Sequence, residues 1–322
     1  MIPARAQFIW IGRDFPWLNW AAIATAQKQG GFERLVLHHT DDLSGSEHAR
    51  ALERLPKVEL NRLSVAGVEL LLERSAGPRL VDLYRVLQAP AARANVLRIA
   101  LLRCEGGVYL DLDTVTCRSL STLRAETGFF CGTERLAFPG SLRGSLNPAR
   151  WAQAYARSAV RDVLRRSAHG VAAFRSIESY YPAAANNAVL GAQPKHPLLD
   201  AMLERMLSLP RERALRRFAL GTGLLQAALA DYSGTDVRVH APESFYPLGP
   251  EISEHWFRED SRAKLDEVVT QSTRVVHWYA SVRTRKIVPN FDPSWMDRHP
   301  KALLCQLLAR TLQEPTGAAG VR

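Results

Sequence analysis

The chain has 322 residues, of which 47% are hydrophobic, so it is long enough for one large domain with insertions or a second lobe. Its formal net charge is +10, with 36 Arg and 6 Lys against 32 acidic residues. The arginines are spread along the whole sequence, and no nucleic-acid-binding module or single basic face is recognisable. This even spread argues against a nucleic-acid partner, and the positive net charge gives mild support for an anionic ligand. The four cysteines show neither metal-ligand spacing nor a disulfide framework.

Neither a membrane-spanning segment nor a signal peptide is apparent. No apolar run approaches the ~20 residues that a membrane helix needs, and residues 1–5 lack the apolar core of a signal peptide. We therefore expect a cytoplasmic protein, with export by another route left open. A peripheral contact with a membrane is a weaker interpretation of the amphipathic segment 301–312, which we expect to dock on the protein.

The first segments predict a nucleotide-binding type of sheet. Residues 7–11 and 34–39 have the composition of strands, and an amphipathic helix is predicted over 17–29. Strand, helix and strand at this spacing are typical of a parallel sheet, in which ligands bind beyond the carboxyl ends of the strands. Trp10 lies at the end of the first strand. It is interpreted either as a core residue, which composition favours, or as a flat surface for a nucleobase.

The rest of the chain continues the alternation of strands and helices. Further strands are predicted around 58–60, 237–240 and 274–279, and helices over 68–74, 95–104, 151–167, 198–209, from about 221–223, and over 301–312. In the 151–167 helix we expect the apolar stripe to pack on the protein and the arginines to face solvent. We expect a single domain over 1–313, with a nucleotide-binding half to about 120, an acceptor half after it, and a flexible tail over 314–322.

The most informative stretch is Glu105-Gly-Gly-Val-Tyr-Leu-Asp-Leu-Asp-Thr-Val115. The two glycines can end the preceding helix, because glycine adopts left-handed backbone conformations without a Cβ clash. In a following strand, alternation would place Asp111 and Asp113 on one side. Buried carboxylates need a positive partner, and their oxygens suit Mg²⁺ or Mn²⁺, which in turn bind phosphate. A solvated strand end with two surface aspartates is the alternative.

Several segments resemble the DXD "sugar-binding region" of glycosyltransferase family 32 and the catalytic domain of the large clostridial glucosylating toxins. The specific block is Asn95-x-x-Arg98 followed by Gly106-Gly107-x-Tyr109-x-Asp111-x-Asp113. Weaker matches follow in the expected order at 8–12, 186–191, 221–223 and 277–278. The resemblance implies an α/β fold of GT-A type, with a Rossmann-like, mixed and mainly parallel sheet flanked by helices and helical insertions.

The resemblance also implies a reaction. The chain would be a hexosyltransferase that uses Mn²⁺ or Mg²⁺ and moves a sugar from a nucleotide-sugar to an acceptor with retention of anomeric configuration. A UDP-sugar is favoured as donor, and GDP-mannose stays open. The acceptor is open among a glycan, a small molecule and a protein.

Site residues are implied in the same way. Asp113 would bind the metal directly, Asp111 would help to hold metal and ribose, and His277 could be a further ligand. The implied catalytic residues are Asp111, Asp113 and Arg98. The implied donor-binding residues are Ile9, Trp10, Asn95, Arg98, Tyr109, Asp111, Asn187, Trp278, Ser281, Arg283 and Lys286. The relatives usually carry aspartate where this chain has Asn95, which puts donor preference and turnover in question.

Two other functions compete with this one. Asp111-Leu-Asp113 also matches the first motif of haloacid-dehalogenase-type phosphohydrolases, with Asp111 as nucleophile and Asp113 as general acid/base. Such an enzyme needs a later acidic pair, and the downstream Asp231 and Asp236 lack the glycine and the apolar strand expected before it. The second alternative is a basic, non-enzymatic binding protein, whose affinity for nucleic acid would fall steeply with salt.

Overall fold

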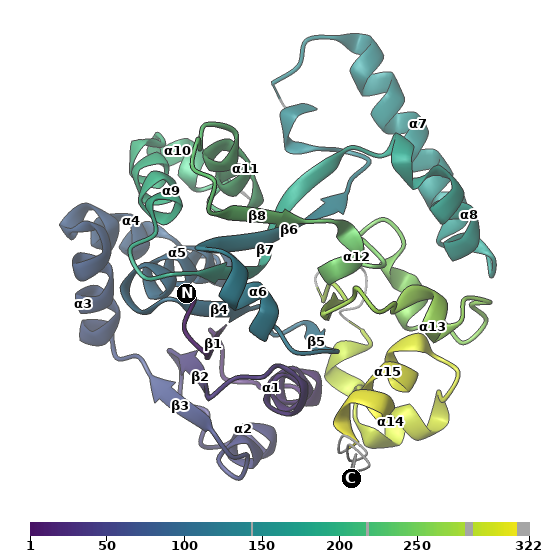
Figure 1. Cartoon of the computed structure of the whole chain (residues 1–322), viewed down its shortest axis with the longest axis horizontal. Helices are drawn as coiled ribbons and strands as arrows, with labels where there is room; N and C mark the ends of the chain where they lie inside the picture. Colours follow the sequence, from purple (N-terminus) through teal and green to yellow (C-terminus); the bar gives the residue numbers. More distant parts are fainter. Residues whose placement is uncertain (143, 217–218, 281–285, 314–322) are drawn as a thin grey trace.

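A seven-stranded sheet organises the molecule (Figure 1). The computed structural model describes residues 1–142, 144–216, 219–280 and 286–313. The strands, in their order across the sheet, are β3 (Val58–Arg62), β2 (Arg34–His39), β1 (Arg5–Trp10), β4 (Gly107–Leu110), β7 (Ala183–Ala192), β6 (Phe129–Arg135) and β8 (Val237–His240). The first four are mutually parallel, β7 is antiparallel to both neighbours, and β8 is parallel to β6. The predicted mixed, mainly parallel α/β sheet is confirmed.

Helices cover both faces of this sheet. Their bounds are α1 (Trp17–Gln29), α2 (Glu47–Leu52), α3 (Val65–Ala76), α4 (Pro78–Val86), α5 (Pro90–Glu105), α6 (Ser121–Glu126), α7 (Pro148–Leu164), α8 (Gly170–Ile177), α9 (Pro197–Ser208), α10 (Arg211–Ala214), α11 (Thr222–Ala230), α12 (Pro242–Phe245), α13 (Leu265–Val268), α14 (Pro293–Arg298) and α15 (Leu303–Leu312). One hydrophobic core lies under α3, α4, α5, α9 and α11, and a second under α1 and α2. A third joins α1 to α15 and the carboxyl-terminal segments. Within the described residues, no helix combines the length and apolar character that crossing a membrane requires.

The helix–glycine–strand prediction is confirmed up to Leu110 and wrong beyond it. Helix α5 ends at Glu105, and Gly106 and Gly107 have φ of 65° and 102°. A Cβ on Gly107 would lie 2.6 Å from the Arg5 carbonyl oxygen, so no side chain fits there. Strand β4 then stops at Leu110 and does not alternate, because all its residues are buried in a sheet covered on both faces.

The chain turns after β4 instead of extending through the DXD motif. It then forms β5 (Thr114–Thr116), which pairs antiparallel with β9 (Val275–His277) in a separate two-stranded sheet. The two aspartates therefore lie on a turn between two sheets. Their proximity comes from this turn and not from strand alternation.

A row of buried polar side chains fixes the register of the parallel strands. Gln7 on β1 donates from Nε2 to the Gly106 carbonyl oxygen (2.7 Å) and accepts through Oε1 from His38 Nε2 on β2 (2.8 Å). His38 Nδ1 accepts from Asn61 Nδ2 on β3 (3.0 Å). Because one ring nitrogen donates and the other accepts, the bonds require a neutral imidazole.

We expect this row to make folding sensitive to mild acid. Burial, reinforced by the charges of Arg5 and Arg34, lowers the pKa of His38 to about 4. The unfolded chain takes up that proton near pH ~6.5. Stability is therefore complete above this value and falls as pH drops towards 4, by about 1.4 kcal/mol per pH unit and roughly 3 kcal/mol in all. Urea unfolding at pH 7 and 4.5 should show the loss in the parent and a smaller one in His38→Gln. An equal loss of stability in the parent and in His38→Gln would contradict the role given to His38.

The carboxyl-terminal helix is docked as expected. Leu303, Leu304, Leu307 and Leu308 of α15 are all buried in the third core. Its apolar face is therefore covered, which leaves no membrane-facing surface on it. The tail 314–322 lies outside the described residues. The main sheet takes strands from both sides of residue 120, so the division into a nucleotide half and an acceptor half stays a prediction.

The prediction for the 151–167 helix is correct in place and only partly correct in orientation: Leu164 packs against the third core, but other residues are turned the opposite way. Helix α7 covers Pro148–Leu164, and with α8 it projects from the body (Figure 1). Arg161 and Arg165 face the protein, whereas Val160 and Val163 are exposed, at 43% and 67%. The acidic residues that hold the arginines come from a segment far along the chain, which the periodicity of α7 could not indicate.

Candidate active site

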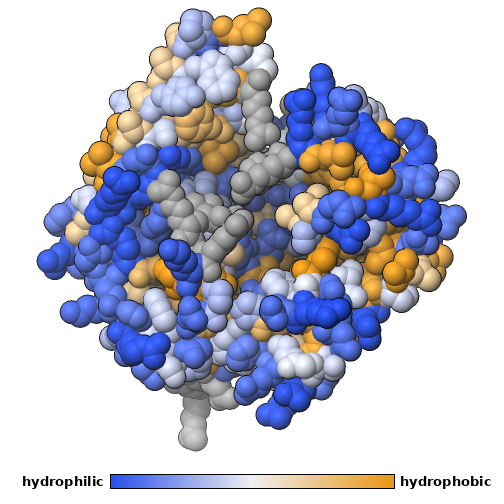
Figure 2. Space-filling view, turned by 180° about the vertical axis from the view of Figure 1, so that it is seen from behind, coloured by the Kyte–Doolittle hydropathy of each residue, from blue (hydrophilic) through white to orange (hydrophobic). Residues whose placement is uncertain are grey.

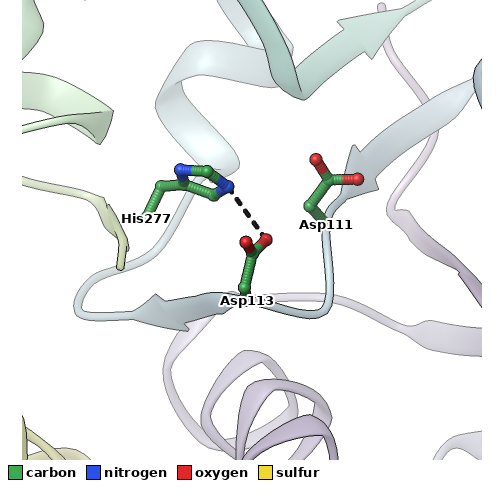
Figure 3. Close-up of side chains that lie close together, drawn as sticks. All are labelled: Asp111, Asp113 and His277. Carbon is green, nitrogen blue, oxygen red and sulfur yellow. Dashed lines mark ion pairs between the residues drawn. The ribbon is translucent and has the colours of Figure 1, made fainter. Parts of the chain in front are cut away.

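Three side chains with metal-binding atoms converge at the carboxyl end of β4 (Figure 3). Asp111 and Asp113 lie on the turn that follows the strand, and His277 ends β9. One ligand atom from each residue lies within 4.8 Å of those of the other two. The pairing of β5 with β9 brings His277 to this place, because it sets His277 opposite Thr114. The predicted third ligand is thus at the site.

Asp113 is held from two directions. Its Oδ1 lies 2.9 Å from His277 Nε2, and its Oδ2 accepts a hydrogen bond from the Ala280 backbone N–H (2.8 Å). Its carbonyl oxygen accepts from the Trp278 N–H (3.0 Å). Tyr279, between these two donors, has φ of 60°, a left-handed conformation that costs energy for a side chain of this size. This bend is part of the segment that wraps the Asp113 carboxylate.

Asp111 is fixed by a buried arginine. Its Oδ1 accepts from Arg98 Nη2 (2.8 Å) and from the Tyr109 hydroxyl (2.7 Å). Arg98, on α5, also donates from Nη1 to the Asn187 carbonyl oxygen and lies over the Tyr109 ring, 4.3 Å from its centroid. The Arg98 side chain is only 6% exposed. In this structure Arg98 therefore orients Asp111.

The charges of the cluster are interdependent. Burial raises the pKa of Asp111 against the opposing effect of Arg98, and the Asp113 charge raises it further. Burial also acts to raise the pKa of Asp113, but the charge and hydrogen bond of His277 oppose it, and the Asp113 pKa is lowered. Burial opposes a charge on His277, yet Asp113 and its neighbours raise the His277 pKa. The arrangement thus favours an imidazolium beside a carboxylate.

This donor set fits a divalent cation. Two carboxylates and one imidazole are ligands that Mn²⁺ accepts, and Mg²⁺ prefers their oxygen atoms. A positive ion bound beside Asp113 and His277 would compete with a proton on His277, because metal binding at such sites releases protons. The residues present therefore suit the ion that the sequence implies.

A second group of predicted residues meets beside the cluster. The Asn187 side chain on β7 donates from Nδ2 to Asn95 Oδ1 on α5 (2.9 Å). Gly221, which precedes α11, is so close that a Cβ on it would lie 3.1 Å from Asn95 Nδ2. Since Arg98 binds the Asn187 carbonyl oxygen, this group is continuous with the Asp111 network. Segments that are separate in the sequence are thus assembled here.

The remaining predicted residues have different surroundings. Ile9 is buried, and Trp10 is half-buried with its ring edge-on to Phe15, at 5.5 Å between centroids. The Trp278 ring is fully buried against Phe257, so it lies in the third core and not on an exposed surface. Lys286 is exposed. Two further predicted residues, Ser281 and Arg283, lie outside the described residues.

Sequence reasoning missed a buried layer behind His277. Glu134 on β6 is 5% exposed and accepts from the Tyr279 hydroxyl (2.7 Å), while burial raises its pKa. Tyr246 packs edge-on against the His277 ring, at 5.9 Å between centroids. Glu134 stands between Thr133 and Arg135 at the polar end of β6, so no local pattern in the sequence singled it out. The packing of Tyr246 had no sequence signal.

A cavity of about 1080 Å³ opens at the carboxyl ends of β1 and β2. It is lined by Arg13, Asp14, Phe15, Pro16, Trp17, Thr40, Asp41, Asp42, Gly45, Ser46, His48, Arg62, Pro289, Phe291 and Asp292. Because β1 neighbours β4 in the sheet, the cavity lies on the same edge as the DXD turn. Its Phe15 contacts Trp10, and its Asp41 accepts from the Gly12 N–H (2.9 Å).

Within the described residues, the two downstream aspartates do not complete a phosphohydrolase site. Asp231 forms an ion pair with Arg205. Asp236 contacts His196 and Tyr232 just before β8, which β7 and β6 separate from β4. Neither aspartate joins the cluster at Asp111, and that alternative loses its required second acidic pair.

Comparisons with known proteins concern the same region. Residues 32–130 match the family model described as "Glycosyltransferase sugar-binding region containing DXD motif". No curated protein matches the sequence significantly.

Several solved structures match this chain at low sequence identity. PaToxG glycosyltransferase is 16% identical, with a TM-score of 0.45 over 71% of this chain and 69% of that one. Mouse xyloside xylosyltransferase 1 is 14% identical, with a TM-score of 0.47 over 86% and 98%. The galactosyltransferase LgtC, solved with donor and acceptor sugar analogues, is 11% identical, with a TM-score of 0.45 over 98% and 97%. The matched segment of this chain includes Arg98, Asp111 and Asp113, so residues 32–130 are similar to a glycosyltransferase sugar-binding region whose DXD motif lies at the carboxyl end of β4.

Proposed function

We propose that this protein is a metal-dependent glycosyltransferase of GT-A type. It transfers a hexosyl group from a nucleotide-sugar, preferably a UDP-sugar, to an acceptor in the cytoplasm, with retention of configuration. The observation that carries the proposal is the cluster of Asp111, Asp113 and His277 at the sheet edge where nucleotides bind in such folds. The family match over residues 32–130 supports it.

The residues of the cluster have distinct tasks. Asp113 and His277 would hold Mn²⁺ or Mg²⁺ together with Asp111, and such an ion, when bound, offsets the charge that develops on a departing diphosphate. Arg98 keeps the Asp111 carboxylate in position, and its charge opposes the rise in the Asp111 pKa that burial causes. The Ala280 N–H fixes the Asp113 carboxylate, so little reorganisation is needed on binding.

The donor would extend along the sheet edge from this cluster. We place its nucleoside next to Trp10 and the adjoining cavity, which is large enough for a nucleotide. The paired Asn95 and Asn187 amides would meet the ribose and sugar hydroxyls. An amide both donates and accepts hydrogen bonds, so Asn95 can serve sugar hydroxyls without the charge of an aspartate.

A panel of nucleotide-sugars with Mn²⁺ tests the proposal. UDP- and GDP-sugars are scored together for slow release of UDP or GDP and for a rise in melting temperature. A donor at 100 times its dissociation constant should add roughly 2.7 kcal/mol of stability. We expect one donor to give both signals, and only with metal. Release of phosphate from simple esters, with no response to any nucleotide-sugar, would contradict glycosyl transfer.

A further inference from the structure

Helix α7 presents its apolar side to solvent. The exposed residues along its outer side are Ala149, Ala152, Gln153, Tyr155, Ala156, Ala159, Val160 and Val163. They recur at intervals of three and four, so they form one continuous face of the helix. Tyr155 and Val163 are 62% and 67% exposed. An apolar face is ordinarily the one that a helix buries, so this orientation requires an explanation.

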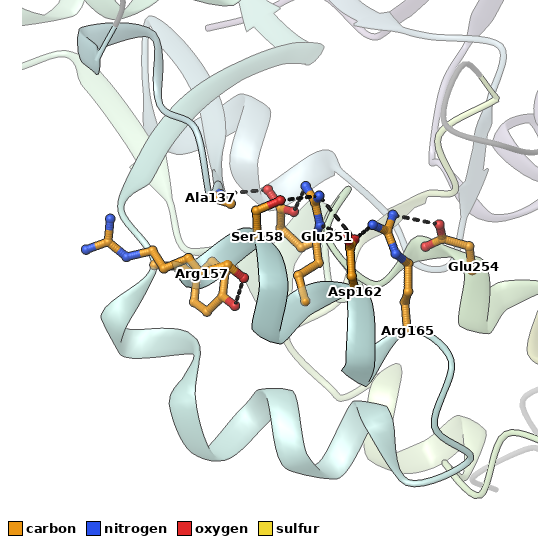
Figure 4. Close-up of polar contacts among 9 residues, drawn as sticks. Ala137, Arg157, Ser158, Asp162, Arg165, Glu251 and Glu254 are labelled. Atoms are coloured by element: carbon orange, nitrogen blue, oxygen red, sulfur yellow. Dashed lines mark hydrogen bonds and ion pairs between the residues drawn. The ribbon is translucent and has the colours of Figure 1, made fainter. Parts of the chain in front are cut away.

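Buried ion pairs hold the helix in this orientation (Figure 4). Arg161 Nη1 lies 2.9 Å from Glu251 Oε2, and Glu251 Oε1 accepts from the Ala137 N–H (2.7 Å). Arg165, 4% exposed, lies 3.3 Å from Glu254. Breaking a buried pair leaves an uncompensated charge, so rotation of the helix to bury its apolar face is strongly opposed. The outward apolar face is therefore a fixed feature.

More apolar surface surrounds this face. We define the arm as residues 138–181, which include α7 and α8. Among the described residues, six of the eleven exposed large hydrophobic side chains belong to the arm: Phe138, Leu146, Tyr155, Val160, Val163 and Tyr180. Leu146, just before α7, is 99% exposed. Figure 2 shows hydrophobic surface beside hydrophilic surface on the projecting lobe at upper left. Exposed hydrophobic side chains that gather on one projecting part of a protein indicate an interaction surface.

The arm is also strongly basic. Its sequence has seven arginines and two acidic residues, Asp162 and Glu178. Both acidic residues form ion pairs with arginines of the arm. Arg150 in the first turn of α7 and Arg166, two residues after its end, are exposed. The arm therefore combines apolar side chains with arginines, on a chain of net charge +10. This combination complements a surface that has anionic groups on the outside and an apolar layer beneath them.

We propose that the arm docks on an anionic lipid bilayer surface. The apolar face of α7 enters the headgroup region, and Arg150 and Arg166 meet lipid phosphates. A second copy fits less well, because α7 is only about 26 Å long and mainly alanine on this face. Such a strip is small against the ~1,200 Å² that a stable interface buries, and two arms of like charge repel. The proposal does not depend on the transferase activity.

Vesicle flotation tests it with a matched pair of variants. Vesicles contain phosphatidylglycerol with phosphatidylcholine, or phosphatidylcholine alone. We expect the parent to float only with the anionic vesicles and to bind more weakly as salt rises. Val160→Glu/Val163→Glu should reduce binding at least tenfold. The control, Val65→Glu/Val239→Glu, changes the net charge equally at exposed valines elsewhere and should bind like the parent.

Each contrary result is informative. Failure of the parent to bind anionic vesicles, or equal losses in the two double variants, would overturn the proposal. A parent that is a dimer by light scattering, and that becomes a monomer in Val160→Glu/Val163→Glu, would also overturn it. The apolar face of α7 would then join two copies of the chain. Circular dichroism and melting temperature check folding. Leu146→Glu, at a fully exposed position, provides a second variant that should weaken binding in the same direction.

Discussion

Asp113→Asn is expected to lower metal-dependent donor turnover by more than about 100-fold, since loss of groups that merely support a metal ligand already costs 10- to 100-fold. The amide oxygen can still accept the Ala280 N–H, so the local backbone should be preserved. The variant lacks the negative charge that faces His277 and the ion. Initial rates of UDP or GDP release, measured against Mn²⁺ concentration, should show both a lower maximum and a weaker metal dependence.

The matched control is Asp236→Asn. Asp236 has the same chemistry but lies before β8, where it contacts His196 and Tyr232. Its replacement should leave turnover unchanged. If Asp113→Asn, or the pair Asp111→Asn/Asp113→Asn, turned donor over at the parent rate, the cluster would not be the catalytic site.

Glu251→Leu is expected to destabilise the protein by about 3–5 kcal/mol, the usual effect of removing one partner of a buried ion pair. Glu251 is 5% exposed, and its two oxygens bind Arg161 and the Ala137 N–H. Its loss leaves the Arg161 charge without its main partner and one backbone donor unsatisfied. Urea unfolding at neutral pH should show a lower midpoint.

The double variant Arg161→Leu/Glu251→Leu serves as the control. Removing both charges avoids the unpaired guanidinium, so it should recover most of the lost stability. A double variant that is less stable than Glu251→Leu alone would contradict the ion-pair explanation. It would show that Arg161 stabilises the arm through its contacts with Ser158 and Asp162.

Local signals predicted much of the secondary structure and part of the site. The bounds of α1, β2 and β8 agree with the sequence prediction. The glycine pair after α5 indicated the helix end, because only glycine tolerates the backbone conformation required there. Asp111 and Asp113 could be found because they are close in sequence and unusual after an apolar strand.

Relations between distant segments required the tertiary structure. His277 meets Asp113 because β9 pairs with β5, and Glu134 on β6 accepts a hydrogen bond from Tyr279, which follows β9. A single sequence carries no record of such pairings beyond the resemblance to relatives.

The sequence by itself determined the type of the main elements, the acidic motif and the apolar stripe of α7. The tertiary structure decided where β4 ends, which residues surround the carboxylates and which way α7 faces. The physical reason is that periodicity reports which side chains share a face but not what lies opposite it. For α7, the partners are Glu251 and Glu254 from a distant segment, and their charges hold Arg161 and Arg165 inward and leave the valines outward.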